Sequence, residues 1–205
     1  MRWRCCIKGR AAHSSMTPQA VNAIEAGARV VARIADIADE LRARETRYEG
    51  FDVPWTTAAV GVMHGGIADN VVPEECRFHY EFRNIPGADA LALQGRVTAY
   101  AAALEPAMQA VDPATGIHFE EICAVPAFLA RHDDPAVQLA QRLAGTDATT
   151  LVGFGTEAGF FQAAGIPTVV CGPGYIAQAH QADEFVGLDQ LAACEAFLRR
   201  LRPAA

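Results

Sequence analysis

Residues 76–83, Cys-Arg-Phe-His-Tyr-Glu-Phe-Arg, alternate without a break between apolar and polar side chains. Successive side chains of a β-strand point to opposite faces, so the cysteine and the three aromatic residues share one face. This alternation is typical of an antiparallel sheet with one covered face, because strands that are buried on both faces are apolar throughout. We therefore expect a half-buried strand at about 76–85.

The segments around this strand predict a regular alternation of strands and helices. Further strands are expected at about 3–8, 56–63 and 116–123. Helices are expected from Thr17-Pro18, which offer an N-cap and a first-turn proline, to about 44, and again at 89–110. The apolar stripe of the first helix is predicted at Ile24, Ala28, Val31, Ala35, Ala38 and Leu41.

The order β-α-β-β-α-β is that of a ferredoxin-like unit, in which two helices cover one face of a four-stranded antiparallel sheet. We assign residues 1–124 to this domain. The remaining residues, 125–205, predict an incomplete α/β unit with helices at about 134–143, from Glu157 and at 188–201, and strands at 149–152 and 168–171. Two strands leave sheet edges and faces uncovered, so this half is expected to lack a partner.

Composition limits the class of protein. The formal net charge is −7, with 51% hydrophobic and 20% charged residues, which is ordinary for a soluble globular protein and argues against nucleic-acid or anionic membrane surfaces. No apolar run approaches a membrane span, and the first residues lack a signal peptide, so we expect a cytoplasmic protein with small-molecule partners. The six cysteines form no C-x-x-C pair, which favours reduced, buried thiols.

The stretch 172–184 carries the clearest chemical signal. It places His180 on a loop just after the predicted strand at 168–171, where ligand sites of α/β sheets collect. His180 is a candidate zinc ligand, with Asp183 or Glu184 close by, but catalytic zinc uses three protein ligands. The chain has no H-E-x-x-H motif, and no His-x-Asp motif precedes its first expected helix. The alternative is an exposed, inert loop histidine.

Several motifs together carry a resemblance to a known family. They are Gly-Thr-Glu-Ala-Gly-Phe-Phe-Gln at 155–162, the stretch 172–184, Ala-His-Ser-Ser at 12–15, Asn-Val-Val-Pro at 70–73 and Phe-Arg-Asn-Ile-Pro-Gly at 82–87. These closely resemble the carboxyl-terminal part of acetylornithine deacetylase, within the zinc peptidase family that includes aminoacylase and succinyl-diaminopimelate desuccinylase. The resemblance covers almost the whole chain; 172–184 is its most specific part and Gly-Thr-Glu its weakest.

The resemblance implies roles for particular residues. His180 matches the last metal ligand, for zinc or cobalt, and His13 matches a catalytic lid residue that reaches the partner subunit's active site and polarises the scissile carbonyl. Asn70 and Arg83 match positions associated with the substrate carboxylate. The turn that lines the substrate pocket matches Thr156, Glu157, Ala158 and Gly159. Without the resemblance, the sequence favours the alternative interpretations, in which His13 is a loop residue and Arg83 a surface strand residue.

The family's catalytic domain begins before the lid, with a His-x-Asp motif, a bridging Asp and a Glu-Glu pair, and the residues ahead of Ala12 in this sequence contain none of them. The pairs Glu74-Glu75 and Glu120-Glu121 lie at strand ends of the first domain and are interpreted as solvated turn charges. The resemblance therefore implies a homodimer formed through the lid, an N-acyl amino acid substrate such as N-acetyl-L-ornithine, an intermediate of arginine biosynthesis, and a missing amino-terminal catalytic half. We expect these 205 residues alone to be inactive and to hold no zinc tightly. One alternative is a non-catalytic dimerisation or amino-acid-binding module, and another is a fragment of a deacylase for another N-acyl amino acid. The coding sequence upstream of Met1 would distinguish a hydrolase fragment from a binding module.

Overall fold

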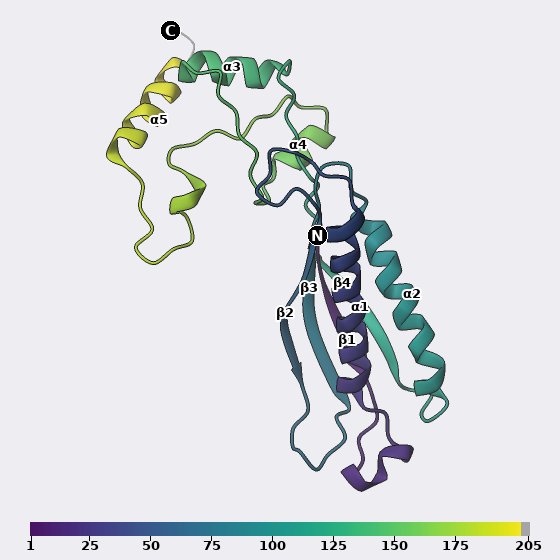
Figure 1. Ribbon diagram of the computed structural model, residues 1–205. Helices are drawn as coiled ribbons and strands as arrows, with labels where there is room; N and C mark the ends of the chain where they lie inside the picture. Colours follow the sequence, from purple (N-terminus) through teal and green to yellow (C-terminus); the bar gives the residue numbers. More distant parts are fainter. Residues whose placement is uncertain (202–205) are drawn as a thin grey trace. The chain divides into compact units, whose positions relative to one another are not determined.

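The structure is a computed structural model that describes residues 1–201, and the chain divides into two compact units (Figure 1). Unit 1 comprises residues 1–49 and 53–124, and unit 2 comprises residues 50–52 and the chain from 125 onward. No helix within residues 1–201 is both long enough and apolar enough to cross a membrane.

Unit 1 is a four-stranded sheet with two long helices. Its elements are β1 (Arg2–Lys8), the 3₁₀ helix η1 (Ser14–Gln19), α1 (Ala23–Arg44), β2 (Thr57–Gly65), β3 (Glu75–Arg83), α2 (Ala90–Gln109) and β4 (Gly116–Cys123). The strand order is β2-β3-β1-β4 and each neighbouring pair is antiparallel. Both helices lie on one face of the sheet (Figure 1). The predicted ferredoxin-like order is therefore confirmed.

The alternating segment forms the strand that was expected. Cys76, Phe78, Tyr80 and Phe82 are each at most 1% exposed, while Arg77 and its charged neighbours face away from the helices. The ring of Trp3 stacks on Tyr80 with the ring centroids 5.8 Å apart. Burial of these aromatic side chains stabilises unit 1, by about 25 cal/mol for each Å² of apolar surface removed from water.

One polar pair lies inside this core. The Tyr80 hydroxyl donates a hydrogen bond of 2.5 Å to Oε1 of Gln94 on α2. Burial raises the pKa of the Tyr80 phenol far above its ordinary value, so the group stays protonated and remains a donor. The bond satisfies both buried groups and ties α2 to the centre of the sheet.

The first helix differs from the sequence prediction at its start and in its buried face. It begins at Ala23 rather than near Thr17, because Oδ1 of Asn22 accepts the Ile24 and Glu25 amides at 3.0 and 3.2 Å. Residues 14–19 form the separate turn η1. The predicted stripe is wrong by about one residue, since the buried positions are Ala23, Ala26, Gly27, Val30, Ile34 and Ile37.

A close approach to the sheet explains which stripe is buried. A Cβ at Gly27 would lie 2.9 Å from Sγ of Cys76 and 3.3 Å from the terminal methyl of Met63. The helix is rich in alanine, so two adjacent stripes have similar apolar character, and the one that contains the glycine packs against the strands because it approaches them most closely.

Unit 2 contains the expected helices but not the expected strands. Its elements are α3 (Pro135–Ala144), α4 (Ala158–Ala163), the 3₁₀ helix η2 (Ile176–Gln178) and α5 (Leu188–Leu201). Neither 149–152 nor 168–171 is a strand, so both strand predictions are wrong. A strand needs ladder hydrogen bonds to a neighbour, and within residues 1–201 neither segment pairs with one.

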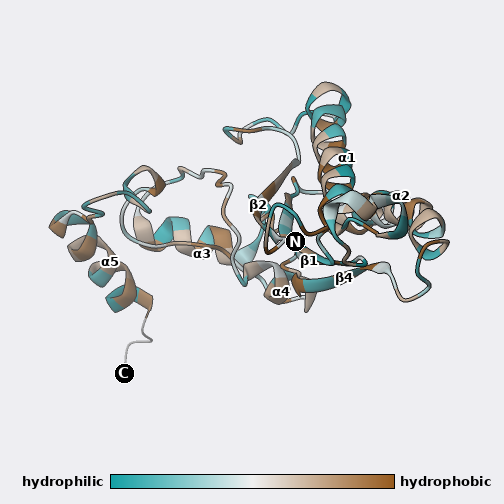
Figure 2. Ribbon diagram, turned by 90° about the horizontal axis from the view of Figure 1, so that it is seen from below, coloured by the Kyte–Doolittle hydropathy of each residue, from teal (hydrophilic) through white to brown (hydrophobic). Residues whose placement is uncertain are grey.

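Few side chains of unit 2 are buried. Within its described residues the buried hydrophobic side chains are Val137, Ala140 and Ala158, and α5 buries none. Figure 2 shows hydrophobic segments alternating with hydrophilic ones along α5. The large apolar side chains left at least 39% exposed in this unit are Leu139, Phe154, Phe160, Phe161, Ile166, Val170, Tyr175, Ile176, Phe185, Val186, Leu188, Leu191, Leu198 and Leu201. Exposed apolar surface on this scale is typical of an interface.

The cysteines are free thiols, but most are not buried as the sequence had suggested. Only Cys5 and Cys76 are buried, in the core of unit 1, whereas Cys123 and Cys171 are exposed. Burial raises the pKa of both buried thiols, so they behave as small apolar side chains.

Two glycines of unit 1 should respond in opposite ways to replacement by alanine. A Cβ at Gly9 would lie 2.1 Å from the carbonyl oxygen of Val21, so we expect Gly9→Ala to destabilise the unit by about 1–3 kcal/mol or more. Gly95 lies inside α2 with open space around it, so Gly95→Ala should stabilise by about 0.5–1 kcal/mol. Urea unfolding followed by tryptophan fluorescence measures both; equal effects would contradict the packing at Gly9.

Candidate functional site

Two loops of unit 1 that carry motif residues lie against each other. The amide of Ser14 donates to the carbonyl of Asn70 at 3.0 Å, and the amide of Val72 donates to that of Ala12 at 2.8 Å. His13 and Val71 form an isolated antiparallel bridge between these two bonds. The structure therefore brings His13 and Asn70 together at one end of the sheet, and both side chains are exposed there.

The His13 ring is held by its own loop through one nitrogen. Its Nδ1 lies 3.3 Å from the backbone amide of Ser15, which donates to it, and 2.8 Å from the Ser15 hydroxyl. The side chain thereby caps the first turn of η1. Nε2 is left as the ring atom with no partner among the described residues, and it is the atom with which His13 can contact another molecule.

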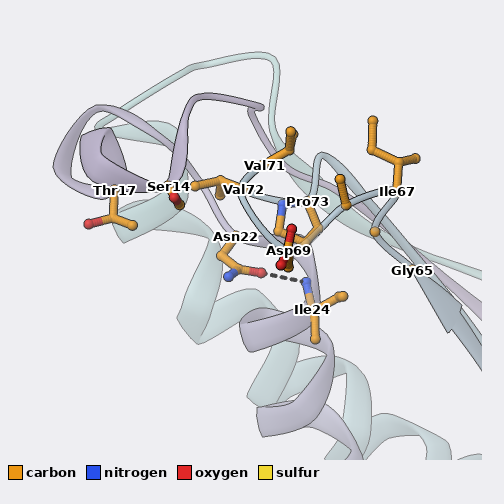
Figure 3. A pocket seen from close by; sticks show the side chains of 12 residues that line it. Ser14, Thr17, Asn22, Ile24, Gly65, Ile67, Asp69, Val71, Val72 and Pro73 are labelled. Atoms are coloured by element: carbon orange, nitrogen blue, oxygen red, sulfur yellow. Dashed lines mark hydrogen bonds between the residues drawn. The ribbon is translucent and has the colours of Figure 1, made fainter.

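A hollow of about 500 Å³ lies beside these loops, at the start of α1 (Figure 3). Ser14, Thr17, Asp69 and Ile67 are among its lining residues, and Asn22 is committed to capping α1. The lining includes a carboxylate but no lysine, arginine or histidine, so it is unsuited to a substrate carboxylate. Neither His13 nor Asn70 lines it.

Arg83 lies at the opposite end of the sheet. It is the last residue of β3, eight positions after Glu75, which places it roughly 26 Å from the start of that strand. Its Nε donates to Oε1 of Glu81 at 2.9 Å, and Arg2 meets the same carboxylate at 3.3 Å. Although burial acts to raise it, the pKa of Glu81 is held below its ordinary value by hydrogen bonds and charge from Arg83 and Arg2. Within one protomer Arg83 therefore cannot act on the same group as His13 and Asn70.

The predicted pocket turn of unit 2 forms the start of α4. The Thr156 hydroxyl accepts the Ala158 amide at 3.0 Å, and Glu157 precedes the helix without a side-chain cap bond. Ala158 and Gly159 are buried, and a Cβ at Gly159 would lie 2.3 Å from the carbonyl oxygen of Pro126. Glu157 is exposed and available to a ligand, whereas Gly159 has a packing reason for being glycine.

His180 lies on an exposed loop with an unusual backbone. His180 and Asp183 have positive φ angles of 58° and 59°, and the His180 amide donates to Oε2 of Glu184 at 2.9 Å. Left-handed residues other than glycine are uncommon and mark a constrained turn. In the part of the chain that the structure describes, no three His, Cys, Asp or Glu side chains come together, so these residues do not fit a complete zinc centre.

Ser15 is a site residue that the sequence reasoning named only as part of a motif. Its contact with His13 depends on the ring orientation, which a sequence does not display. The available signal was its position two residues after a histidine at the start of a turn, a spacing at which side chains cap backbone amides.

Comparison with known proteins defines the class of this chain. Residues 1–109 match the family described as "Peptidase dimerisation domain", and these residues include β1 to α2 with the paired loops of His13 and Asn70. The chain belongs to the peptidase dimerisation-domain family. The structure also resembles a tripeptidase of Staphylococcus aureus, with a TM-score of 0.69 and 22% identity over 96% of this chain and 49% of that one, which shows a shared fold.

Among proteins of curated function, the chain is similar to acetylornithine deacetylases. It is 34% identical to that of Myxococcus xanthus over 194 residues, which is 95% of this chain and 50% of the relative. It is also 34% identical to that of Salmonella arizonae over 180 residues, or 88% and 45% of the two chains. The chain thus spans about half the length of the curated relatives it matches.

The exposed positions of unit 1 should be replaceable without loss of stability. The Asn70 side chain makes no hydrogen bond in the structure, and its loop is paired through the backbone carbonyl, so Asn70→Ala should change the free energy of unfolding by less than about 0.5 kcal/mol. Arg83→Met loses one exposed ion pair, worth at most about 1 kcal/mol. Urea unfolding tests both; a larger loss would give these residues a structural role.

Proposed function

We propose that this chain supplies the dimerisation domain and the carboxyl-terminal catalytic segment of an amide hydrolase that removes an acyl group from an N-acyl amino acid, with N-acetyl-L-ornithine as the first substrate to test. The observation that carries the proposal is the 34% identity to an acetylornithine deacetylase over 95% of this chain, a range that includes residues of both units. Similarity confined to unit 1 would support only a shared dimerisation fold.

Each candidate residue has a distinct task in this proposal. His13 donates a hydrogen bond from Nε2 to the scissile carbonyl, where negative charge develops as the amide is attacked. Asn70 and Arg83 bind the substrate carboxylate, and the turn 156–159 borders the pocket. His180 is one ligand of a zinc or cobalt ion whose remaining ligands an amino-terminal catalytic half would supply.

The placement of Arg83 requires two copies of the chain if both carboxylate-binding residues act on one substrate. Asn70 and Arg83 are at opposite ends of the sheet within a protomer, so a carboxylate that touches both must lie between two protomers. An arrangement of this kind agrees with a fold that belongs to a dimerisation family. It also gives the exposed Nε2 of His13 a partner outside its own subunit.

Strand β2 is the edge of unit 1 best suited to pair with a second copy. β2 contains no Asp, Glu, Lys or Arg, and Val62 and Met63 are 44% and 39% exposed. The other edge, β4, carries Glu120 and Glu121, and charges of this kind prevent edge-to-edge association. We propose that two β2 strands meet and extend the sheet across the dimer.

Charge placed on the two edges should distinguish them. Val62→Lys introduces a charge at the proposed interface and should convert dimer to monomer, measured by size-exclusion chromatography with light scattering. Ile122→Lys places the same charge on a similarly exposed side chain, 39%, of the β4 edge and should leave the dimer intact. A monomeric parent chain, or dissociation by Ile122→Lys alone, would contradict the proposed interface.

The hydrolase itself is tested by a fusion. We expect the amino-terminal half of the Myxococcus xanthus relative, joined to this chain, to release acetate from N-acetyl-L-ornithine when zinc or cobalt is supplied. His13→Ala should lower kcat by roughly 10²- to 10³-fold through loss of an oxyanion donor, and His180→Ala should abolish activity through loss of a metal ligand. His132→Ala, at an exposed histidine without a hydrogen-bond partner in the structure, is the matched control and should have no effect.

The second candidate is a non-catalytic amino-acid-binding or dimerisation module. It is favoured by the lack of any group of three metal-binding side chains in residues 1–201. A fusion that is dimeric and folded but inactive, together with calorimetric binding of ornithine to the unfused chain, would favour this module. Fusion activity that is indifferent to both His13 and His180 would refute the site assignment.

A further inference from the structure

The contacts of the His13 ring determine where its proton lies. A neutral imidazole carries one N–H and one bare nitrogen, and which nitrogen is protonated follows from the bonds that each makes. The backbone amide of Ser15 can only donate, and it lies 3.3 Å from Nδ1 with an acceptable angle. A proton on Nδ1 would oppose this amide proton, so Nδ1 is the bare nitrogen and Nε2 carries the hydrogen.

The Ser15 side chain strengthens the same arrangement. Its hydroxyl oxygen is 2.8 Å from Nδ1, within the ordinary range for an O–H donor. The hydroxyl and the amide of one residue thus converge on one lone pair, while the bond from Ser14 to Asn70 and the His13–Val71 bridge hold the backbone on either side of the ring. Ring rotation would break both contacts to Ser15, and a tautomer change would replace the bond from the Ser15 amide by an opposition of two N–H groups.

We propose that Ser15 is a positioning residue that holds His13 as the neutral Nε2–H tautomer, with that N–H presented outward as a hydrogen-bond donor. This rests on the proposed function, in which His13 contacts a substrate carbonyl. It excludes the opposite role for the ring, because a general base at Nε2 would need a lone pair there. His13 therefore donates to an oxygen that gains negative charge and removes no proton from water or substrate.

The tautomer can be measured on the unfused chain without any activity. Long-range ¹⁵N–¹H correlation spectra at alkaline pH, where imidazoles are neutral, separate a protonated from a bare ring nitrogen, and His13→Gln identifies the His13 signals. We expect Nδ1 of His13 to be bare to a greater degree than in free histidine. Ser15→Ala should move the signals toward those of free histidine, Ser15→Thr should restore them, and Ser14→Ala, one residue away, should leave them unchanged.

Three spectroscopic results would overturn the inference. They are a protonated Nδ1 in the parent chain, a His13 spectrum equal to that of free histidine, or a spectrum that Ser15→Ala does not alter. Each of these results depends only on the tautomer of His13. A fusion that fails to hydrolyse N-acetyl-L-ornithine would therefore refute the proposed function but leave the inference about Ser15 unaffected.

An active fusion adds a kinetic test. Ser15→Ala should lower kcat by roughly fivefold, the equivalent of one ordinary hydrogen bond, with little change in KM, because the donor matters most as charge develops on the oxygen. Ser15→Thr should recover most of the loss. A change confined to KM would contradict the positioning role.

Discussion

The pairing of β1 with β3 on one side and β4 on the other is the constraint on which the rest of unit 1 depends. Lys8 is opposite Glu75 and Gly116, so the end of the first strand meets the start of the third and the fourth. Antiparallel pairing then places the loop after β1 beside the loop before β3, and these are the loops of His13 and Asn70. The same register carries Arg83, at the far end of β3, away from them.

This register also determines the core. Because Cys5 is opposite both Phe78 and Phe119, the apolar side chains of three strands lie on one face, where α1 and α2 cover them. The hydrogen bond from Tyr80 to Gln94 adds a directional contact to packing that is otherwise non-directional. A slip of one residue in β1 would turn its apolar side chains to the open face, so the motif loops depend on the same interactions that stabilise the core.

In unit 2 the helix ends follow from residue types a few positions apart, although its described residues form no sheet. Asp134 caps α3 through the Ala136 amide at 2.8 Å, and Gly145 ends that helix with a φ of 70°, as these residue types predict. The strands expected at 149–152 and 168–171 did not form, because β-propensity describes a pleated, half-buried surface and needs a neighbour to be realised. Many apolar side chains of α4 and α5 are exposed, because the described residues of unit 2 form no sheet on which these helices could pack.

The sequence by itself determined the properties that depend on near neighbours. We could predict the period-two pattern of β3, the order of strands and helices in unit 1, several helix ends and the family-level motifs. Each of these depends on residues that are only a few positions apart in the sequence. Only the tertiary structure decided which of two alanine-rich stripes of α1 is buried, that His13 meets Asn70 while Arg83 does not, and that Ser15 holds the His13 ring. Close approach at Gly27 and antiparallel strand register decided the first two, and both depend on residues that are distant in the chain; the orientation of the His13 ring decided the third, and no residue type specifies it.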